Sequence, residues 1–407
     1  MRVTTCRLCK TGHLSEPKLS FPPTPLANEF LKEPVPQDVF PLLVAVCEAC
    51  GHYQLTESID PERLFTTYSY AAGHSAANIA HFEEAANHQV EKFGLPKGSK
   101  ILDIASNDGT LLKAFKKLGM EVLGIDPAQN LTSEANAAGI PTLTDFFTAA
   151  KAEDMKKEYG VFDVVTANNV FAHVPDLEDF ARGVKIILAP NGVSSFEVSY
   201  FVDVCDKALF DTIYHEHSSY HTLAPLIPFF KKLRMEFFDV EHLPNHGGSV
   251  RVYVRHEGAG VRSIDGGEAD RLTALLFPEK TIEQKVEALK EKISHLREEL
   301  SEKLHALKME GKAIAGYGAP AKATTLLYTF GIDNSVIDFV VEDAPLKQGT
   351  YMPGLAIPIL PSSAIAERHP DALLVLAWNF AESIIENNPG FKGVWIVPLP
   401  ELRMIQP

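Results

Sequence analysis

Residues 100–112 read KILDIASNDGTLL, in which a mainly apolar segment leads into a turn of small and polar residues and then into a helical pattern. This order predicts a β-strand followed by a helix whose first backbone N–H groups are open to a ligand. A second apolar segment, residues 121–127, contains Asp126 about 20 residues after the turn, where a carboxylate can bind ribose hydroxyls. The stretch therefore predicts the first unit of a nucleoside-binding α/β fold.

Two further strands are predicted at residues 140–147 and 162–171. Strands that alternate with helices predict a doubly wound parallel sheet, which binds its ligand at the carboxyl ends of the strands. The turn DIASNDG contains Gly109 but lacks the G-x-G-x-x-G pattern of a dinucleotide fold. Taken alone, the turn is compatible with a nucleoside cofactor and with an ordinary connection between strand and helix.

The chain has 407 residues, of which 45% are apolar and 22% are charged, and its formal net charge is −15. A chain of this length usually forms two or three domains. The acidic balance disfavours nucleic acid as a partner, because binding a phosphate backbone needs a surplus of Lys and Arg. The negative net charge remains compatible with a small anion that binds in a local pocket.

The sequence shows neither a membrane segment nor a leader. No apolar segment approaches the roughly 20 residues that span a bilayer, and the first residues lack the apolar run of a signal peptide. We therefore expect a cytoplasmic protein without a membrane partner, in which the five cysteines stay reduced.

Four of these cysteines form two Cys-x-x-Cys pairs, Cys6 with Cys9 and Cys47 with Cys50. Two such pairs can direct four thiolates at one zinc ion and so stabilise a small fold. Redox dithiols and unligated thiols are the alternatives. Because four protein ligands leave no open coordination position, the predicted zinc is structural.

Residues 214–221 read YHEHSSYH, which concentrates three histidines, one carboxylate and two tyrosines. The stretch is compatible with a metal site, a proton-transfer site or a polar loop. His215 and His217 would share one face of a strand, but the sequence marks no further ligand for a second metal. A histidine that is mostly neutral at cellular pH can accept a proton.

The C-terminal part begins with a long amphipathic helix predicted at residues 279–312, either a dimer-forming coiled coil or a connector that packs on a neighbouring domain. Residues 313–327, AIAGYGAPAKATTLL, then predict a strand, a Gly-rich turn and a helix. Further strands are predicted at residues 336–341, 373–377 and 393–397. This pattern predicts a second α/β domain, whose turn and Lys322 can bind a phosphate.

Read in order, the cysteine pairs, DIASNDG, YHEHSSYH, HGGSVRVYV (residues 246–254) and GYGAPAKATTLL (residues 316–327) resemble the sugar C-methyltransferases. The best-known members of that family methylate C3 of nucleotide-linked 4-keto-deoxysugars. The resemblance implies an N-terminal zinc-binding module (residues 1–70) and a central Rossmann-like class I methyltransferase domain (71–275). It also implies a C-terminal Rossmann-like α/β domain (276–407) that helps to hold a sugar nucleotide, most simply a TDP-sugar.

The resemblance implies S-adenosylmethionine as the cofactor, in contact with the turn and the strand ends. Ala105 and Asn107 replace glycines of the methyltransferase motif. The residues themselves support a ribose role for Asp126, whereas the others also fit capping of the turn or the ends of strands. The implied cofactor residues are Asp103, Ser106, Asn107, Gly109, Asp126, Asp145 and Asn168.

The implied reaction needs a base that removes the C3 proton next to a carbonyl, and donors near the oxygen of the resulting enolate. By resemblance, Tyr214, Glu216 and His217 line the sugar site. We assign His217 as the base, Tyr214 as a hydrogen-bond donor and Glu216 as the carboxylate that orients or stabilises the histidines. Further substrate contacts are expected from Tyr68, Tyr70, His215, His246 and Lys322.

Two other functions remain compatible with the sequence. One is an O- or N-methyltransferase of a sugar or small molecule, which needs no keto group. The other is a zinc-containing binding protein with a degenerate methyltransferase fold. The sequence does not decide between monomer and dimer.

Overall fold

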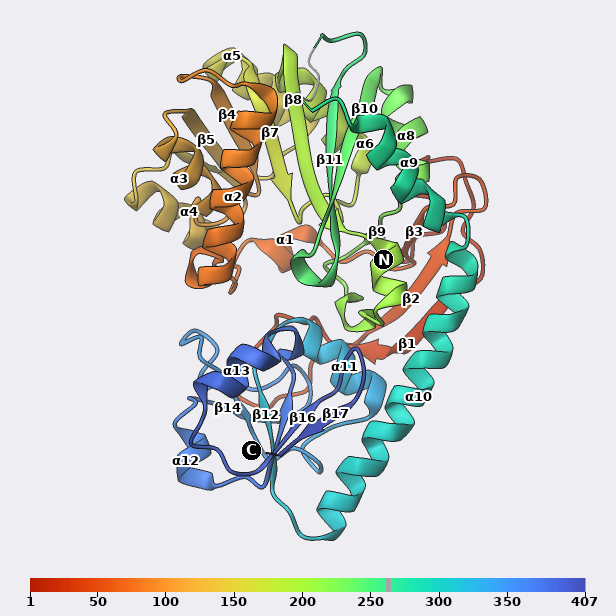
Figure 1. Cartoon of the computed structure of the whole chain (residues 1–407), viewed down its shortest axis with the longest axis vertical. Helices are drawn as coiled ribbons and strands as arrows, with labels where there is room; N and C mark the ends of the chain where they lie inside the picture. Colours follow the sequence, from red (N-terminus) through yellow and green to blue (C-terminus); the bar gives the residue numbers. More distant parts are fainter. Residues whose placement is uncertain (261–264, 407) are drawn as a thin grey trace.

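The computed structural model describes residues 1–260 and 265–406. Three β-sheets organise the described chain: one of seven strands, one of four and one of six. Figure 1 shows the seven-stranded sheet with its helices at the top and the six-stranded sheet at the bottom, with the N-terminal strands beside the junction between them.

The seven-stranded sheet has the order β10-β11-β8-β7-β4-β5-β6. Strands β4 to β8 run parallel, whereas β11 is antiparallel to both β8 and β10. Its strands are β4 (Lys100–Ile104), β5 (Glu121–Asp126), β6 (Thr142–Thr144), β7 (Phe162–Asn168), β8 (Leu188–Ser199), β10 (Met235–Leu243) and β11 (Ser249–His256). This arrangement confirms the predicted doubly wound sheet.

Helices cover both faces of this sheet, because its central strands carry apolar side chains on both sides. One face packs against α2 (Ala76–Phe93), α3 (Thr110–Lys117) and α4 (Gln129–Ala137). The other face packs against α5 (Ala149–Tyr159), α6 (Leu177–Ile187), α8 (Leu223–Lys232) and α9 (Glu268–Glu279). The turn DIASNDG follows β4 at the carboxyl edge of the sheet.

The four-stranded antiparallel sheet joins the N-terminal module to the central domain. Its strands are β1 (Leu19–Thr24), β2 (Phe40–Val46), β3 (Tyr53–Leu55) and β9 (Ser219–Tyr220), in that order. Strand β9 belongs to YHEHSSYH and pairs with β3 through Tyr53 and Tyr220. The stretch that carries the candidate catalytic groups is therefore part of the module's own sheet.

The six-stranded sheet is parallel except for its last strand and has the order β14-β13-β12-β15-β16-β17. Its strands are β12 (Ile314–Tyr317), β13 (Val340–Val341), β14 (Ile359–Leu360), β15 (Ala372–Val375), β16 (Val394–Val397) and β17 (Arg403–Ile405). The helices of this domain are α11 (Lys322–Phe330), α12 (Ala364–Arg368) and α13 (Ala381–Asn387). Each strand predicted for this domain is present, although β13 is shorter than the predicted segment 336–341.

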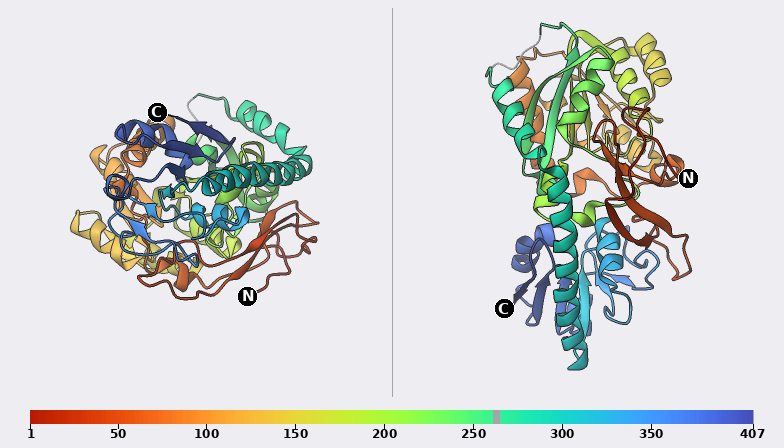
Figure 2. Two further views of the ribbon diagram at one scale, coloured as in Figure 1. Left: turned by 90° about the horizontal axis from the view of Figure 1, so that it is seen from below. Right: turned by 90° about the vertical axis from the view of Figure 1, so that its right-hand side faces the viewer.

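The long helix α10 (Ile282–Met309) runs along one side of the molecule from the central domain past the C-terminal sheet (Figure 2). Its buried residues Val286, Leu289 and Leu300 belong to one hydrophobic core with residues of β1, β2 and the C-terminal sheet. Of the two predicted alternatives, α10 therefore matches the connector that packs on a neighbouring domain. Over the described residues, no helix combines the length and apolar character needed to cross a membrane.

Short elements complete the fold. They are α1 (Pro61–Phe65), α7 (Phe201–Asp206) and four 3-10 turns, η1 (Ala72–His74), η2 (Phe210–Thr212), η3 (Asn245–Gly247) and η4 (Trp378–Phe380). Three of these turns matter for the site: η1 precedes α2, η2 precedes YHEHSSYH, and η3 joins β10 to β11.

Candidate active site and zinc site

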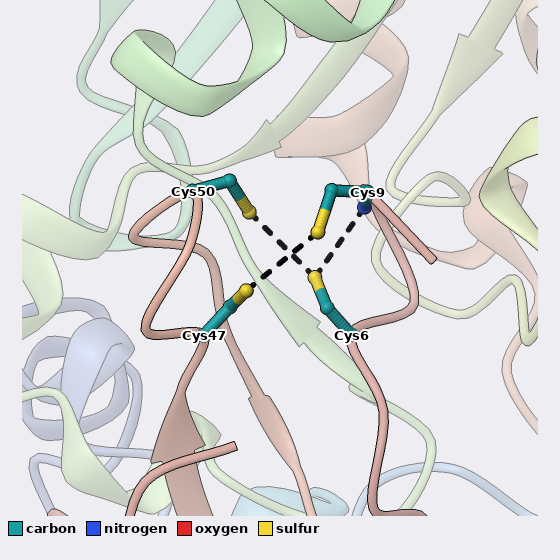
Figure 3. A group of neighbouring side chains, drawn as sticks. All are labelled: Cys6, Cys9, Cys47 and Cys50. Carbon is teal, nitrogen blue, oxygen red and sulfur yellow. Dashed lines mark hydrogen bonds between the residues drawn. The ribbon is translucent and has the colours of Figure 1, made fainter. Parts of the chain in front are cut away.

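The four N-terminal cysteines converge on one point (Figure 3). Cys6 Sγ lies 3.7 Å from Cys50 Sγ, and Cys9 Sγ lies 3.7 Å from Cys47 Sγ. All four sulfur atoms lie within 4.8 Å of one another. A tetrahedral zinc ion with Zn–S bonds of about 2.3 Å separates its sulfurs by about 3.8 Å. The cysteines therefore form a zinc-binding site that fits the ion without rearrangement.

Backbone groups of the cysteine turns support this site. The amides of Leu8 and Gly12 donate to the sulfurs of Cys6 and Cys9, each at 3.3 Å. A Cβ atom at residue 12 would lie 2.1 Å from Cys47 Sγ, so only glycine fits there. Because all four ligand positions are protein sulfurs, the site stabilises the fold and leaves no position for catalysis.

The turn after β4 has the backbone of a Gly-rich turn with only one glycine. Ala105, Asn107 and Gly109 have φ angles of 54°, 55° and 77°, all in the left-handed region that favours glycine. A Cβ atom at Gly109 would lie 3.0 Å from Ile140 Cγ2, so this glycine also allows close packing. The two substitutions at glycine positions therefore keep the conformation of the motif.

Two buried carboxylates stand at the strand ends beside this turn. Asp126 accepts hydrogen bonds from the amides of Asn107 at 2.9 Å and Ala128 at 2.8 Å, and burial raises its pKa. Asp103 accepts from Thr166 Oγ1 at 2.6 Å, and burial raises its pKa to about 7. Because a carboxylate has about four acceptor sites, Asp126 can still accept from ribose hydroxyls while it orders the turn.

The other predicted cofactor residues differ in their settings. Ser106 is buried, and its hydroxyl has no partner within the described part of the chain. A buried hydroxyl of this kind costs free energy unless a ligand or water supplies the bond, so it fits a polar atom of the cofactor. Asp145 is exposed and pairs with Lys151 at 2.7 Å, and Asn168 is half-buried at the end of β7.

A segment preceding α2, residues 66–75, covers the turn and will be called the covering segment. The amide of Ala72 donates to Asn107 Oδ1 at 2.9 Å, and Asn107 Nδ2 donates to the carbonyl of Tyr70 at 3.0 Å. The amide of Gly73 donates to Asp108 Oδ2 at 2.8 Å. The ring of Tyr70 is 44% exposed. The polar turn side chains therefore hold the covering segment over the predicted cofactor site.

Glu216 of YHEHSSYH connects three distant parts of the chain. Its Oε2 accepts from the hydroxyl of Tyr68 at 2.9 Å, and its Oε1 accepts from Asn28 Nδ2 at 2.7 Å. The residue is 2% exposed, and burial raises its pKa to about 7, while the two donors act in the opposite direction. Glu216 can therefore exist in both protonation states near neutral pH.

His217 is held in one tautomer by the main chain. Its Nδ1 lies 2.6 Å from the carbonyl oxygen of Thr212, and because a carbonyl only accepts, Nδ1 carries the proton. Burial lowers the pKa of His217 to about 4, so the ring is neutral at pH 7. The ring of Tyr214 packs on it with centroids 4.2 Å apart. His217 therefore presents Nε2 as a free proton acceptor.

His215 points to a different environment. Its Nε2 lies 3.2 Å from the carbonyl oxygen of Pro41, and its ring meets Phe40 edge-on. The residue is 4% exposed. Of the two neighbouring histidines, His215 contacts the N-terminal sheet and His217 contacts the candidate site.

His173 is a site residue that the sequence analysis missed. Its ring stacks on the ring of His217 with centroids 4.9 Å apart and also on Phe65 at 5.5 Å. Both histidines line one cavity together with Asn169 and Ser219. His173 lies five residues beyond the end of β7, so a polar side chain at a carboxyl strand end was the available signal.

Two further predicted substrate residues lie at the edges of the domains. His246 is exposed in η3, and the glycines after it allow close approach, since a Cβ atom at Gly248 would lie 2.2 Å from Asp203 Oδ2. Lys322 Nζ lies 3.8 Å from Asp211 Oδ2 and 3.9 Å from the centre of the Trp378 ring. Lys322 thus stands at the N-terminus of α11, between the C-terminal and central domains.

Family models match most of the chain in three parts. A "Putative zinc binding domain" matches residues 6–65, a "Methyltransferase domain" matches residues 79–237, and a "C-methyltransferase C-terminal domain" matches residues 244–400. The last match therefore includes β11, which lies between β10 and β8 in the seven-stranded sheet.

Curated relatives include one that matches over nearly the whole of both chains. C-methyltransferase NovU of Streptomyces niveus is 34% identical over 99% of this chain and 97% of its own. The mitochondrial ubiquinone biosynthesis O-methyltransferase of Bos taurus is 35% identical, but over only 23% of this chain and 27% of its own. A solved structure, the PH0226 protein from Pyrococcus horikoshii OT3, covers 48% of this chain and 97% of its own at 16% identity and a TM-score of 0.38.

Proposed function

Because the chain belongs to the family of S-adenosylmethionine-dependent C-methyltransferases, we propose that it methylates C3 of a nucleotide-linked 4-keto-deoxysugar, most simply a TDP-sugar. The relative of full length is named a C-methyltransferase, which gives the reaction class. The substrate class is our proposal from the sequence motifs and the geometry of the site.

The observation that carries the proposal is the protonation state of His217. Carbon is not nucleophilic until a proton is removed, so a C-methyltransferase needs a base that is neutral and accessible at the working pH. His217 has its proton fixed on Nδ1 by the Thr212 carbonyl, which leaves Nε2 as an acceptor. General-base catalysis of this kind contributes about 10²–10⁴ in rate.

The proposed reaction has two steps, removal of the C3 proton and transfer of the methyl group. His217 Nε2 takes the proton from C3, and the electron pair of that C–H bond delocalises onto the neighbouring carbonyl oxygen as an enolate. Tyr214 is the hydroxyl donor that we propose for this charge, because the hydroxyl of Tyr68 already donates to Glu216. The enolate carbon then forms the new C–C bond, and His217 afterwards releases its proton to solvent.

S-adenosylmethionine, when bound, supplies the methyl group from its sulfonium and keeps the electron pair of the broken S–C bond. The residues that we propose to hold it are Ser106 and Asp126, at the turn whose amide at Gly109 already donates to the carbonyl of Ser106. The unpartnered hydroxyl of buried Ser106 supports this placement. The covering segment lies over the same turn and would exclude water from the reacting atoms.

The sugar nucleotide is proposed to enter from the C-terminal domain, with its phosphates near the turn after β12 and Lys322. Part of this turn already has protein partners, since the amide of Ala319 donates to Glu342 Oε2 at 2.7 Å. The phosphates would therefore rely on Lys322 and the start of α11 rather than on the Ala319 amide.

Solvent exchange tests the proposal. The zinc-loaded protein is incubated in deuterated water with a TDP-4-keto-deoxysugar, with and without S-adenosylmethionine, and C3 is followed by NMR. We expect deuterium at C3 without the methyl donor and a new methyl group at C3 with it. Methyl transfer to an oxygen or nitrogen, or no reaction and no exchange, would refute C3 methylation of this substrate class.

A further inference from the structure

The carboxylate of Glu216 has no cation partner within 4 Å over the described residues, although it is almost fully buried. Its two hydrogen bonds come from neutral groups, the hydroxyl of Tyr68 and the amide of Asn28. A buried carboxylate without a cation depends on such donors to stay ionised. The two donors are therefore the groups that set its charge.

Asn28 comes from the N-terminal module, 188 residues away in sequence. It follows β1 in a segment, residues 25–37, that packs against the C-terminal domain. The carbonyl of Ala27 accepts from Thr324 Oγ1 at 3.4 Å, and the carbonyl of Leu31 accepts from the amide of Tyr351 at 2.9 Å. These contacts fix the main chain on both sides of Asn28, so its amide has little freedom to move away from Glu216.

We propose that Asn28 is a positioning residue for methyl transfer, which orients the Glu216 carboxylate and keeps it ionised beside His217. The N-terminal module would thus contribute directly to the active site, in addition to its zinc. This inference rests on the proposed function and on the role predicted for Glu216 from the sequence, a carboxylate that orients or stabilises the histidines. Nothing in the local sequence around Asn28 marks such a role, because the contact arises only from the packing of the three domains.

The proposal has a definite pH signature. The titratable and charged groups that face Glu216 are Tyr68 from the covering segment, Tyr214 from its own loop and Lys347 from the C-terminal domain. Lys347 donates to the carbonyl of Ala319 and acts on Glu216 only at longer range. Removing the Asn28 donor destabilises the ionised form, so the pKa of Glu216 must rise.

A hydrogen bond to a charged group is worth enough to move a pKa by about one unit. In Asn28→Leu, the acidic limb of the kcat profile is therefore expected to move to higher pH by about one unit. Activity lost at pH 7 should return largely at pH 9, whereas the KM for S-adenosylmethionine should stay within about twofold. Asn28→Gln, which keeps an amide donor, should restore part of the shift.

Gln37 supplies a matched control on the same segment. Its Oε1 accepts from the amide of Gly354 at 2.6 Å, and its Nε2 donates to the carbonyl of Glu29 at 2.8 Å. Gln37→Leu therefore weakens both the contact with the C-terminal domain and the main chain next to Asn28, but it removes no hydrogen bond to Glu216. We expect this variant to change stability but not the pH profile. If the Asn28 variants and Gln37→Leu lower kcat equally at every pH, Asn28 has only a structural role and the inference is wrong.

A double-mutant cycle separates this inference from the proposed function. If Glu216 is the titrating group, Glu216→Gln removes the acidic limb, and adding Asn28→Leu then has no further effect on the profile. If Glu216→Gln retains full activity and the same limb, the catalytic role of Glu216 fails whatever Asn28 does. If the limb belongs to Glu216 but Asn28→Leu leaves it in place, only the present inference fails.

Discussion

At the scale of single residues, we predict opposite effects on catalysis for substitutions of His217 and His215, although the two are only two positions apart. His217→Gln removes the proposed base, so we expect kcat and the rate of C3 exchange to fall together by about 10²–10⁴. Binding of S-adenosylmethionine, measured by calorimetry, should be unchanged, because His217 contacts Thr212, Tyr214 and His173 rather than the turn after β4.

His215→Gln is the matched control for this pair. Our proposal gives His215 no role in the reaction. Its ring contacts Phe40 and the carbonyl of Pro41. We expect a lower melting temperature with near-normal C3 exchange in the protein that remains folded. Equal loss of exchange in both variants would remove the distinction on which the assignment of the base depends.

His221, four residues beyond His217, is expected to make the protein less stable in acid. It is 1% exposed and stacks on Phe171, and burial lowers its pKa from 6.5 to about 4. Above pH 6.5 both the folded and the unfolded chains hold it neutral, so its contribution to stability is complete. Between pH 6.5 and 4 only the unfolded chain takes up the proton, and the free energy of unfolding falls by up to about 3 kcal/mol.

The measurement is chemical unfolding at pH 7.5 and pH 5. The loss of unfolding free energy between these pH values should be smaller in His221→Phe, which keeps an aromatic ring of similar shape, than in the natural chain. His305→Gln, at an exposed position on α10, is the control. An unchanged pH dependence in His221→Phe would show that other groups dominate acid unfolding.

At the scale of elements, the zinc turns and strand β9 couple metal binding to the active site. Gly12→Ala would place a Cβ atom 2.1 Å from Cys47 Sγ, so we expect zinc to be lost or bound more weakly. Because β3 pairs with β9 directly after His217, disorder in the module should also disturb the active site. Zinc content by atomic absorption and kcat should therefore fall together, although no zinc ligand touches the substrate in our proposal.

The second cysteine turn offers the control for this prediction. Gly51 has a φ angle of 77°, and a Cβ atom there would meet nothing within 4 Å. Asn tolerates this conformation, so Gly51→Asn should keep both zinc and activity. Full activity in a zinc-free Gly12→Ala protein would contradict the coupling through β9.

The elements also show what sequence patterns can and cannot specify. The two cysteine pairs, the strands that alternate with helices and the amphipathic repeat of α10 are local patterns, and each appears in the structure as predicted. The contacts of Glu216 with Tyr68 and Asn28 join residues 148 and 188 positions apart. No local pattern encodes such contacts, so Asn28 could not be found from one sequence, whereas YHEHSSYH could, and His173 could have been found only from its place after the end of β7.

At the scale of the whole molecule, α1 and β9 lie between the seven-stranded and the six-stranded sheets (Figure 1), and Glu216 accepts hydrogen bonds from the covering segment and from the N-terminal module. The C-terminal domain is fastened to the central domain by a buried group around Asp211, which is fully buried in η2. Trp378 Nε1 donates to Asp211 Oδ2 at 2.6 Å, and Thr325 Oγ1 donates to the carbonyl of Ile213 at 2.7 Å. The position of this domain therefore fixes the residues directly before Tyr214.

Lys322 belongs to the same buried group, which gives it two possible roles. Its ammonium lies 3.8 Å from Asp211 Oδ2 and over the Trp378 ring, and burial lowers its pKa. It can fasten the two domains, and it can also bind the phosphates of the proposed sugar nucleotide. A fastening role affects stability and the whole reaction, whereas a phosphate contact affects the affinity for one substrate.

Two variants separate these roles. Lys322→Met leaves the buried Asp211 carboxylate without its cation, and removal of one partner from a buried pair costs about 3–5 kcal/mol. Trp378→Phe removes the hydrogen bond to Asp211 but keeps an aromatic face and the charge of Lys322. We expect both variants to lower the melting temperature, and only Lys322→Met to raise the KM for the sugar nucleotide, by tenfold or more for a lost charge-assisted contact (about 1.4 kcal/mol). If the two variants raise this KM equally at the same loss of stability, Lys322 fastens the domains and the phosphates bind elsewhere.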